Sequence, residues 1–167
     1  MSLSLDEGVN KCLLRDVRVD ELFELVPTKG LSRPTLKHGP YPLIMSISNS
    51  NGYGDYVDQY THDGVFISVP STGSVGYCFV QKGKFCMLES SAHPPSLLKL
   101  KDEYKYLEEC LSALAFTMTV YFTRKYNYST KLNNSRLMNE VIPNIPFVQA
   151  ANGEWIIDVS GLKYMYL

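Results

Sequence analysis

A stripe of apolar residues runs through residues 102–125 and constrains the fold more than any other feature of the sequence. Its members recur at steps of three and four residues, the spacing that places side chains on one face of a helix. They are Tyr104, Leu107, Leu111, Leu114, Met118 and Tyr121. Acidic residues gather toward the beginning of this segment, and Arg124 and Lys125 close it, as the helix macrodipole favours. The pattern predicts one continuous helix whose apolar stripe belongs to the core.

Short apolar segments bounded by glycine, proline and asparagine indicate strands on both sides of this helix. Residues 16–26 begin with strand-like alternation and end in one or two helical turns. Further strands are predicted at residues 43–47, 64–69, 74–81, 85–88 and 155–159, with tight turns at 49–54 and 82–84. Polar loops are predicted over 27–42 and 126–136. The proline-containing segment 141–148 is predicted to be extended chain that cannot lie in the middle of a sheet. We therefore expect a single domain over residues 16–167, after an N-terminal extension of residues 1–15.

Length and composition narrow the class of protein. A chain of 167 residues can bury a sizeable core without metals or disulfides. The composition excludes a disordered tail, a collagen-like fibre and a coiled-coil rod. The four cysteines form no C-x-x-C pair, which favours free buried thiols over disulfides. Without a signal peptide or an apolar run of about 20 residues, the chain is expected to be cytoplasmic and to make no membrane contact.

The charge distribution bears on nucleic-acid binding. The net charge of -1 argues against it when taken alone, because DNA-binding domains are usually basic. Residues 25–54, 65–88 and 111–139, however, contain no acid. These windows hold nine of the 16 basic residues, namely Lys29, Arg33, Lys37, Lys82, Lys84, Arg124, Lys125, Lys131 and Arg136. The net charge therefore does not exclude DNA binding, although solvated basic loops without a ligand remain the alternative.

Polar loops within these windows carry side chains suited to reading bases. Arginine can bind guanine through two hydrogen bonds, asparagine can bind adenine in the same way, and lysine can fix phosphates. We predict base contacts from Asn49, Asn51 and Tyr53 on the first turn and from Asn133, Asn134, Ser135 and Arg136 on the late loop. We predict contacts along the DNA backbone from Lys29, Arg33 and Lys37. Lys82, Lys84, Arg124 and Lys131 complete the predicted DNA-binding set.

Blocks of sequence between Val17 and Pro146 follow one another in a recognisable order. They are Val17-Arg18-Val19-Asp20-Glu21-Leu22-Phe23-Glu24-Leu25 with Lys29-Gly30, then Tyr41-Pro42-Leu43-Ile44 with Asn49-Ser50-Asn51-Gly52-Tyr53-Gly54, then Gly64-Val65-Phe66-Ile67-Ser68-Val69 with Gly73-Ser74-Val75-Gly76, and finally Ile142-Pro143-Asn144-Ile145-Pro146. In order and spacing they resemble the target recognition domain of type I restriction–modification specificity subunits. The same domain occurs fused in bifunctional restriction–methylation enzymes.

The resemblance implies an α+β domain with a curved, mostly antiparallel β-sheet and one or two packed helices. It implies that loops dock into the major groove of double-stranded DNA, without catalysis and without a cofactor. Methyl transfer and cleavage would belong to methyltransferase and nuclease subunits or to fused domains. Specificity subunits normally carry two such domains separated by long helices, whereas one is expected here. A whole protein, a half-subunit and a domain of a larger enzyme all remain open.

Enzyme patterns in the sequence are weak. Glu103-Tyr104-Lys105 matches the E-x-K of a nuclease but lies in the predicted helix, not on a strand. The glycine-containing segment 71–76 is followed by a predicted strand, so the helix that would hold a methyltransferase cofactor is missing. His38, His62 and His93 are widely separated and indicate surface loops. The twelve tyrosines leave one alternative, a protein-interaction or viral structural module that reuses the fold without binding DNA.

Overall fold

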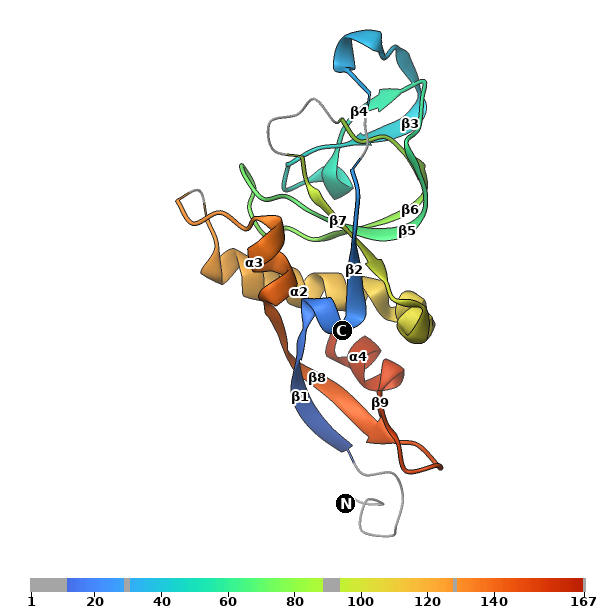
Figure 1. Ribbon diagram of the computed structural model, residues 1–167, viewed down its shortest axis with the longest axis vertical. Coiled ribbons are helices and arrows are strands. Elements are labelled where there is room, and N and C mark those ends of the chain that lie inside the picture. The colour runs from blue at the N-terminus through green and yellow to red at the C-terminus, as the bar shows by residue number, and fades with distance from the viewer. Residues whose placement is uncertain (1–11, 29–30, 89–93, 128, 167) are drawn as a thin grey trace.

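The computed structural model describes residues 12–28, 31–88, 94–127 and 129–166. Helix α2 (Leu111–Lys125) crosses the middle of the molecule, with the strands of residues 23–100 above it and the strands of residues 12–18 and 141–157 below it (Figure 1). The strands of the described residues form three sheets whose ladders are antiparallel. The predicted α+β class with mostly antiparallel strands is confirmed.

The largest sheet lies above α2. In spatial order its strands are β2 (Phe23–Val26), β7 (Ser96–Leu100), β5 (His62–Val69) and β6 (Phe79–Phe85). The strand predicted at 64–69 is confirmed as the main part of β5. The turn predicted at 82–84 is wrong, because Gly83 stays paired with Gly64 inside the β5–β6 ladder. The strands predicted at 74–81 and 85–88 are only partly right, because 79–81 and Phe85 belong to the single strand β6. Gly83 has a φ of 85°, which a glycine adopts without strain.

A two-stranded hairpin lies next to this sheet. It pairs β3 (His38–Ile44) with β4 (Tyr53–Val57), and the connection contains the 3₁₀ turn η3 (Ser50–Gly52). The loop predicted over 27–42 is only partly right, because the 3₁₀ turn η2 (Arg33–Thr35) and the first residues of β3 lie within it. Ile44 N donates to Cys86 O at 3.0 Å, and Cys86 N donates to Pro42 O at 2.9 Å. These bonds hold β3 against the end of β6.

The lower sheet corrects the prediction for segment 141–148. Strand β8 (Val141–Gln149) lies in the middle of this sheet, between β1 (Cys12–Arg18) and β9 (Trp155–Ile157). Its prolines are tolerated because β9 pairs only with 147–149, so Pro143 and Pro146 lie where β8 has a single neighbour strand. Asn144, between them, has a φ of 57° and accompanies a register shift against β1. Because β1 begins at Cys12, the sheet also includes four residues that the sequence assigned to the N-terminal extension.

The predicted helix over 102–125 consists of two different helices. Residues 102–110 form the 3₁₀ helix η4 (Asp102–Cys110), and Cys110, with φ −119° and ψ 20°, separates it from α2. The step of three between Tyr104 and Leu107 suits three residues per turn as well as an α-helix, so the spacing could not reveal the break. The central stripe residues are buried as predicted. No helix among the described residues is long and apolar enough to cross a membrane.

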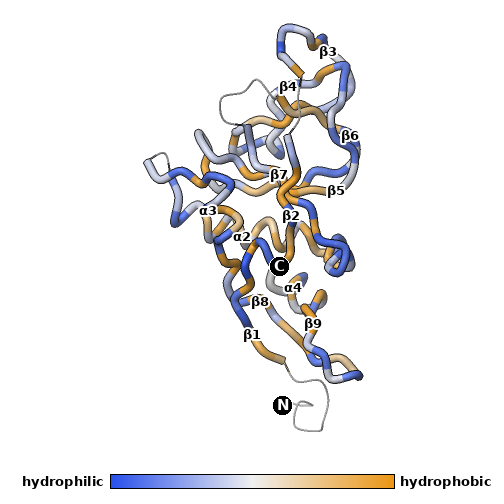
Figure 2. Tube along the Cα trace, in the orientation of Figure 1, coloured by the Kyte–Doolittle hydropathy of each residue, from blue (hydrophilic) through white to orange (hydrophobic). Residues whose placement is uncertain are grey.

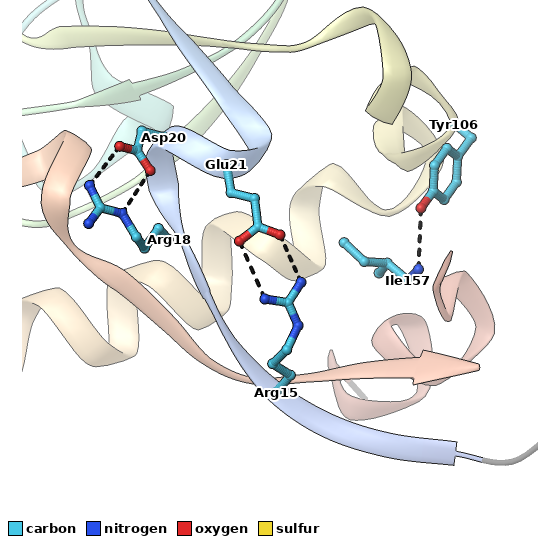
Figure 3. A network of polar contacts seen from close by, with 6 residues as sticks. All are labelled: Arg15, Arg18, Asp20, Glu21, Tyr106 and Ile157. Carbon is cyan, nitrogen blue, oxygen red and sulfur yellow. Dashed lines mark hydrogen bonds and ion pairs between the residues drawn. The ribbon is translucent and has the colours of Figure 1, made fainter. Parts of the chain in front are cut away.

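The core lies on both sides of α2. Leu114, Met118 and Phe122 of α2 belong to one cluster with residues of β5, β7 and β8, and with Leu162 of α4 (Val159–Tyr166). Figure 2 shows apolar stretches of β2, β5 and β7 meeting above α2. At the lower end, Ile157 N donates to the hydroxyl of Tyr106 at 3.3 Å, which ties β9 to η4 (Figure 3). This core gives the loops of the upper part a rigid support.

Three thiols are expected to be unreactive in the native protein. Cys78, Cys86 and Cys110 are buried, as predicted, whereas Cys12 is exposed on β1. Burial raises the pKa of Cys78 far above its ordinary value and the pKa of Cys110 to about 11. Because the thiolate is the reactive form, an aromatic disulfide reagent at pH 8 should modify Cys12 alone before denaturation and all four cysteines after it. Rapid modification of a second cysteine in the native protein would contradict the described packing.

Candidate nucleic-acid interface

The first predicted contact region is the turn between β3 and β4. Three successive residues adopt positive φ, with 51° at Ser50, 54° at Asn51 and 82° at Gly52. Gly52 N donates to Asn49 O and Met45 N donates to Gly52 O, both at 2.9 Å. Asparagine and glycine tolerate this left-handed conformation, which is why the sequence signals a turn here. The turn is thus a defined structure that exposes Asn49 and Ser50.

The three predicted base-contact residues of this turn have different environments. Asn51 faces β6, where its Nδ2 donates to Val80 O at 3.0 Å. Tyr53 is half-buried against a separate apolar cluster that includes Ile44 and Phe85, and its ring is edge-on to that of Tyr56. Asn49 is exposed, and its side chain makes no hydrogen bond within the described part of the chain. Of the three, Asn49 therefore has the side chain best placed to contact a ligand.

The late loop is shorter than predicted. Helix α3 (Asn134–Asn139) begins inside the segment 126–136, and Asn133 is its N-cap. The Oδ1 of Asn133 accepts the N–H of Arg136 at 2.9 Å, while the guanidinium of Arg136 donates to Lys131 O at 2.7 Å. Asn134 Oδ1 accepts a hydrogen bond from Ser96 Oγ on β7. The predicted residues are therefore brought together at the start of a helix, where several of their polar groups already have partners.

Removing the N-cap should destabilise this region. Asn133→Ala deletes the acceptor for Arg136 N, and the loss of an asparagine N-cap costs about 1 kcal/mol. The free energy of unfolding, measured by urea denaturation, should fall by that amount. Ser135→Ala is the matched control, because the Ser135 side chain is exposed on the first turn of the same helix. An equal loss in both variants, or none in Asn133→Ala, would contradict the capping role.

A second set of contacts holds α3 in place. Arg18, at the end of β1, pairs with Asp20 of α1 (Val19–Leu22) at 2.7 Å and also donates to Asn139 Oδ1 of α3 at 2.8 Å. Arg15 pairs with Glu21 at 2.7 Å (Figure 3). Both ion pairs are largely exposed, so each contributes little to stability, but Arg18 links three elements. The position of the late loop is thus set from both of its sides.

The acid-free windows do not form acid-free surfaces. Arg33 pairs with Asp55 at 2.7 Å, and Lys125 pairs with the buried Glu140 at 2.6 Å. Asp55 and Glu140 each lie one residue beyond a window and return to it in the fold. The distribution of charged residues along the sequence could not show this, because the pairing depends on tertiary structure. The predicted backbone contact of Arg33 is consequently weakened by a neighbouring carboxylate.

The remaining predicted cations lie on several elements. Lys37, Lys82 and Arg124 are exposed and make no ion pair within the described part of the chain. Lys84 lies over the ring of Tyr60, with Nζ at 4.8 Å from the ring centroid. The cations come from the segment before β3, from β6 and from the end of α2. Lys29 lies outside the described residues.

One pocket lies between the late loop and the start of the polar segment predicted over 27–42. Asn134 and Ser96 line it together with Val26, the last residue of β2, and Thr28, two residues further on. The side chains of the β3–β4 turn do not line this pocket. The predicted set therefore divides into a late-loop group beside the end of β2 and a turn group beside β6.

Two polar residues escaped the sequence analysis. Gln81 is buried in β6 and bonds to Asn51 of the turn, and Ser96 bonds to Asn134. Gln81 was assigned to the end of a strand before a tight turn, so no burial was expected for it. Once β6 continues to Phe85, the alternation of the strand puts Lys82 and Lys84 outward and Gln81 inward.

The candidate catalytic groups that the structure describes lie on separate elements. Within the described residues, no group of three or more His, Cys, Asp or Glu side chains is arranged to hold a metal ion. Glu103 lies in the helix η4, as predicted, and not on a strand as the E-x-K pattern of a nuclease would need. The prediction that His62 lies in a surface loop is wrong. His62 lies in β5, its ring stacks on that of Phe85, and its Nε2 lies 3.1 Å from Pro27 O. His93 lies outside the described residues.

Comparisons with known proteins bear on the fold. No protein-family model and no curated protein matches the sequence. Among solved structures, the S subunit of a type I restriction–modification system from M. genitalium matches 91% of this chain at a TM-score of 0.63 and 19% identity. The two proteins share a fold. The HsdS subunit from Thermoanaerobacter tengcongensis matches 92% of the chain at a TM-score of 0.48 and 13% identity.

The match is partial on the side of the S subunit. The chain spans 37% of the length of the M. genitalium protein. The M. genitalium S subunit has the fold that the resemblance of the sequence blocks implied. Because the likeness is one of fold, the roles of individual residues rest on the geometry described above.

Proposed function

We propose that this chain recognises a specific sequence in double-stranded DNA for a restriction–modification system. The observation that carries the proposal is the fold shared with a type I S subunit over 91% of the chain. The exposed asparagine turn and the arginine at the start of α3 supply groups of the kind that read base edges. Catalysis is assigned to partner subunits or fused domains, and no cofactor is assigned to this chain.

The exposed residues of the site divide by role in this proposal. Asn49 and Arg136 are the candidates for base contact, because Asn49 is exposed and a guanidinium retains several N–H donors after one is used. Lys37, Lys82 and Lys131 are candidates for phosphate contacts, which set affinity without reading sequence. Asn51, Asn133 and Asn134 would shape the interface through their internal hydrogen bonds.

Exposed apolar residues supply a surface for a protein partner. Leu14 of β1 is 62% exposed, and Ile156 of β9 is 40% exposed. Strand alternation places both on the outward face of the lower sheet, away from the DNA-contact candidates of the upper part. A methyltransferase subunit, or a nuclease subunit, is the partner class that the proposal implies, with the complex in the cytoplasm.

Duplex binding tests the proposal directly. Fluorescence anisotropy with labelled duplexes should show binding at low salt, and the affinity should fall steeply as salt rises, because phosphate contacts release counterions. A chain with net charge -1 should bind modestly on its own. If no duplex bound even at low salt, the DNA-recognition proposal would be abandoned.

The second candidate is a protein-interaction module without DNA binding. The exposed Leu14 and Ile156 favour it, because large apolar side chains on a sheet face are typical of protein interfaces. This candidate predicts association with a purified methyltransferase partner in DNA-free buffer and no binding to any duplex. The DNA-recognition proposal predicts duplex binding that Leu14→Glu leaves unchanged.

A further inference from the structure

The side chain of Gln81 makes contacts that its place in a strand does not require. Gln81 is 1% exposed, and its Nε2 donates to the backbone oxygen of Asn51 at 2.9 Å and to Ser68 Oγ at 3.1 Å. Its Oε1 accepts from Asn51 Nδ2 at 3.5 Å. One buried amide thus binds both the backbone and the side chain of a single residue in an exposed turn. We refer to the Gln81–Asn51 pair as the clasp.

The clasp acts on the most constrained part of the turn. Asn51 is the middle one of three successive residues with positive φ, a conformation that single residues adopt but that non-glycine residues disfavour. Asn51 Nδ2 also donates to Val80 O, so both bonds anchor the turn to the same strand, β6. Gly52 lies directly on this strand as well, since an added Cβ would come within 3.4 Å of the Phe79 ring. The left-handed turn is therefore held by β6.

The strand that carries Gln81 is itself firmly held. Gln81 is paired with Phe66 in the β5–β6 ladder, and Ser68, the third member of the network, is also 1% exposed on β5. Because the Gln81 amide and the Ser68 hydroxyl are both buried and hydrogen-bonded, the amide of Gln81 is held in one orientation. A rigid sheet thereby fixes the orientation of a solvent-exposed turn.

We propose that Gln81 is a positioning residue for DNA recognition, which holds the turn so that Asn49 and Ser50, and not Asn51, face the bases. This inference rests on the proposed function and refines it. All three residues are exposed, but the Asn51 amide is hydrogen-bonded to β6, whereas the side chains of Asn49 and Ser50 make no hydrogen bond within the described part of the chain. Ser50 joins the candidate base-contact residues, since a hydroxyl can donate to or accept from a base edge.

The first part of the test needs no DNA. Gln81→Met keeps the side-chain length and removes the hydrogen-bonding groups, so amide exchange at Gly52 and Met45 should speed up by roughly tenfold or more. The amide of Leu98 in β7 should keep its rate. Ser68→Ala is the control, because it removes the other acceptor of Gln81 and leaves the clasp intact. Unchanged exchange at Gly52 and Met45 in Gln81→Met would overturn the positioning role.

A second variant guards against a folding failure of the buried substitution. Asn51→Asp keeps the size and the turn preference of the exposed residue but cannot donate to Val80 O or to Gln81 Oε1. It should also speed up exchange at Gly52 and Met45. If Asn51→Asp folded with wild-type exchange at both amides, the clasp would not hold the turn and the proposal would fail.

The second part concerns base choice. After selection from a randomised duplex pool, Asn49→Ala and Ser50→Ala should each relax the preference at one or two adjacent positions. Gln81→Met should relax those same positions and leave the others unchanged, a pattern that a general loss of stability would not produce. Equal weakening at every position, or no change, would overturn the inference. If the wild type bound no duplex, the base-reading role would fail with the proposed function, while the exchange data would still report on the clasp.

Discussion

Replacing Leu114 by alanine is expected to lower the free energy of unfolding by about 2–5 kcal/mol. Leu114 is fully buried in the middle of α2, in the cluster that joins this helix to the sheets on both sides. Removing its branched end leaves a cavity that rigid neighbours fill only in part. Urea denaturation followed by circular dichroism measures the loss, which would bring a domain of ordinary stability close to unfolding.

Val120→Ala on the same helix is the control for this prediction. Val120 is 36% exposed, and its truncation should change the free energy of unfolding by no more than about 0.5 kcal/mol. A loss in Leu114→Ala as small as that in Val120→Ala would mean that α2 does not occupy the centre of the core.

Arg136→Ala is expected to weaken binding to the preferred duplex by about 10- to 100-fold, which is the loss of affinity expected when one two-bond arginine–guanine contact is removed. The bond from its guanidinium to Lys131 O orients the side chain at the start of α3. Binding to unrelated duplexes should change much less, so the preference at one base position should relax. Anisotropy titrations with the preferred duplex and with single-base variants measure both effects.

Two variants separate base reading from charge. Lys131→Ala removes a neighbouring positive charge and should weaken all duplexes alike, with the slope of log affinity against log salt reduced by about 1. Arg136→Lys keeps the charge and loses the planar pair of donors, so it should behave like Arg136→Ala in base choice. If Arg136→Ala weakened all duplexes equally, Arg136 would be a phosphate contact and not a base contact.

The sequence predicted the core better than the connections. The stripe from Leu107 to Met118 and the strand at 64–69 follow from periodicity and apolar content, which burial enforces wherever the chain runs. The turn at Asn49 to Gly54 was predictable because its residue types tolerate positive φ. These features depend on neighbours in sequence. The structure confirms the buried stripe, the strand and the turn as far as Gly52, whereas Tyr53 and Gly54 begin β4.

The errors arose where partners distant in sequence decide the structure. Pro143 and Pro146 are compatible with the central strand β8 because its neighbour β9 is short and pairs only with residues 147–149. The sequence of segment 141–148 does not indicate how far β9 extends. Gly83 resembles a turn glycine, yet it lies opposite Gly64 in a continuous ladder. The acids that neutralise Arg33 and Lys125 lie just outside the windows that seemed free of acid in sequence. For the same reason Gln81, whose role depends on Asn51 and Ser68, could not be assigned from its own segment.

Selection of bound duplexes from a fully randomised pool, followed by sequencing, tests the central claim most directly. The wild-type chain, incubated at low salt, is predicted to enrich one defined sequence motif, and Arg136→Ala should lose the preference at one position of it. Recovery of a pool with the same base frequencies as the starting pool would contradict sequence-specific DNA recognition by this domain.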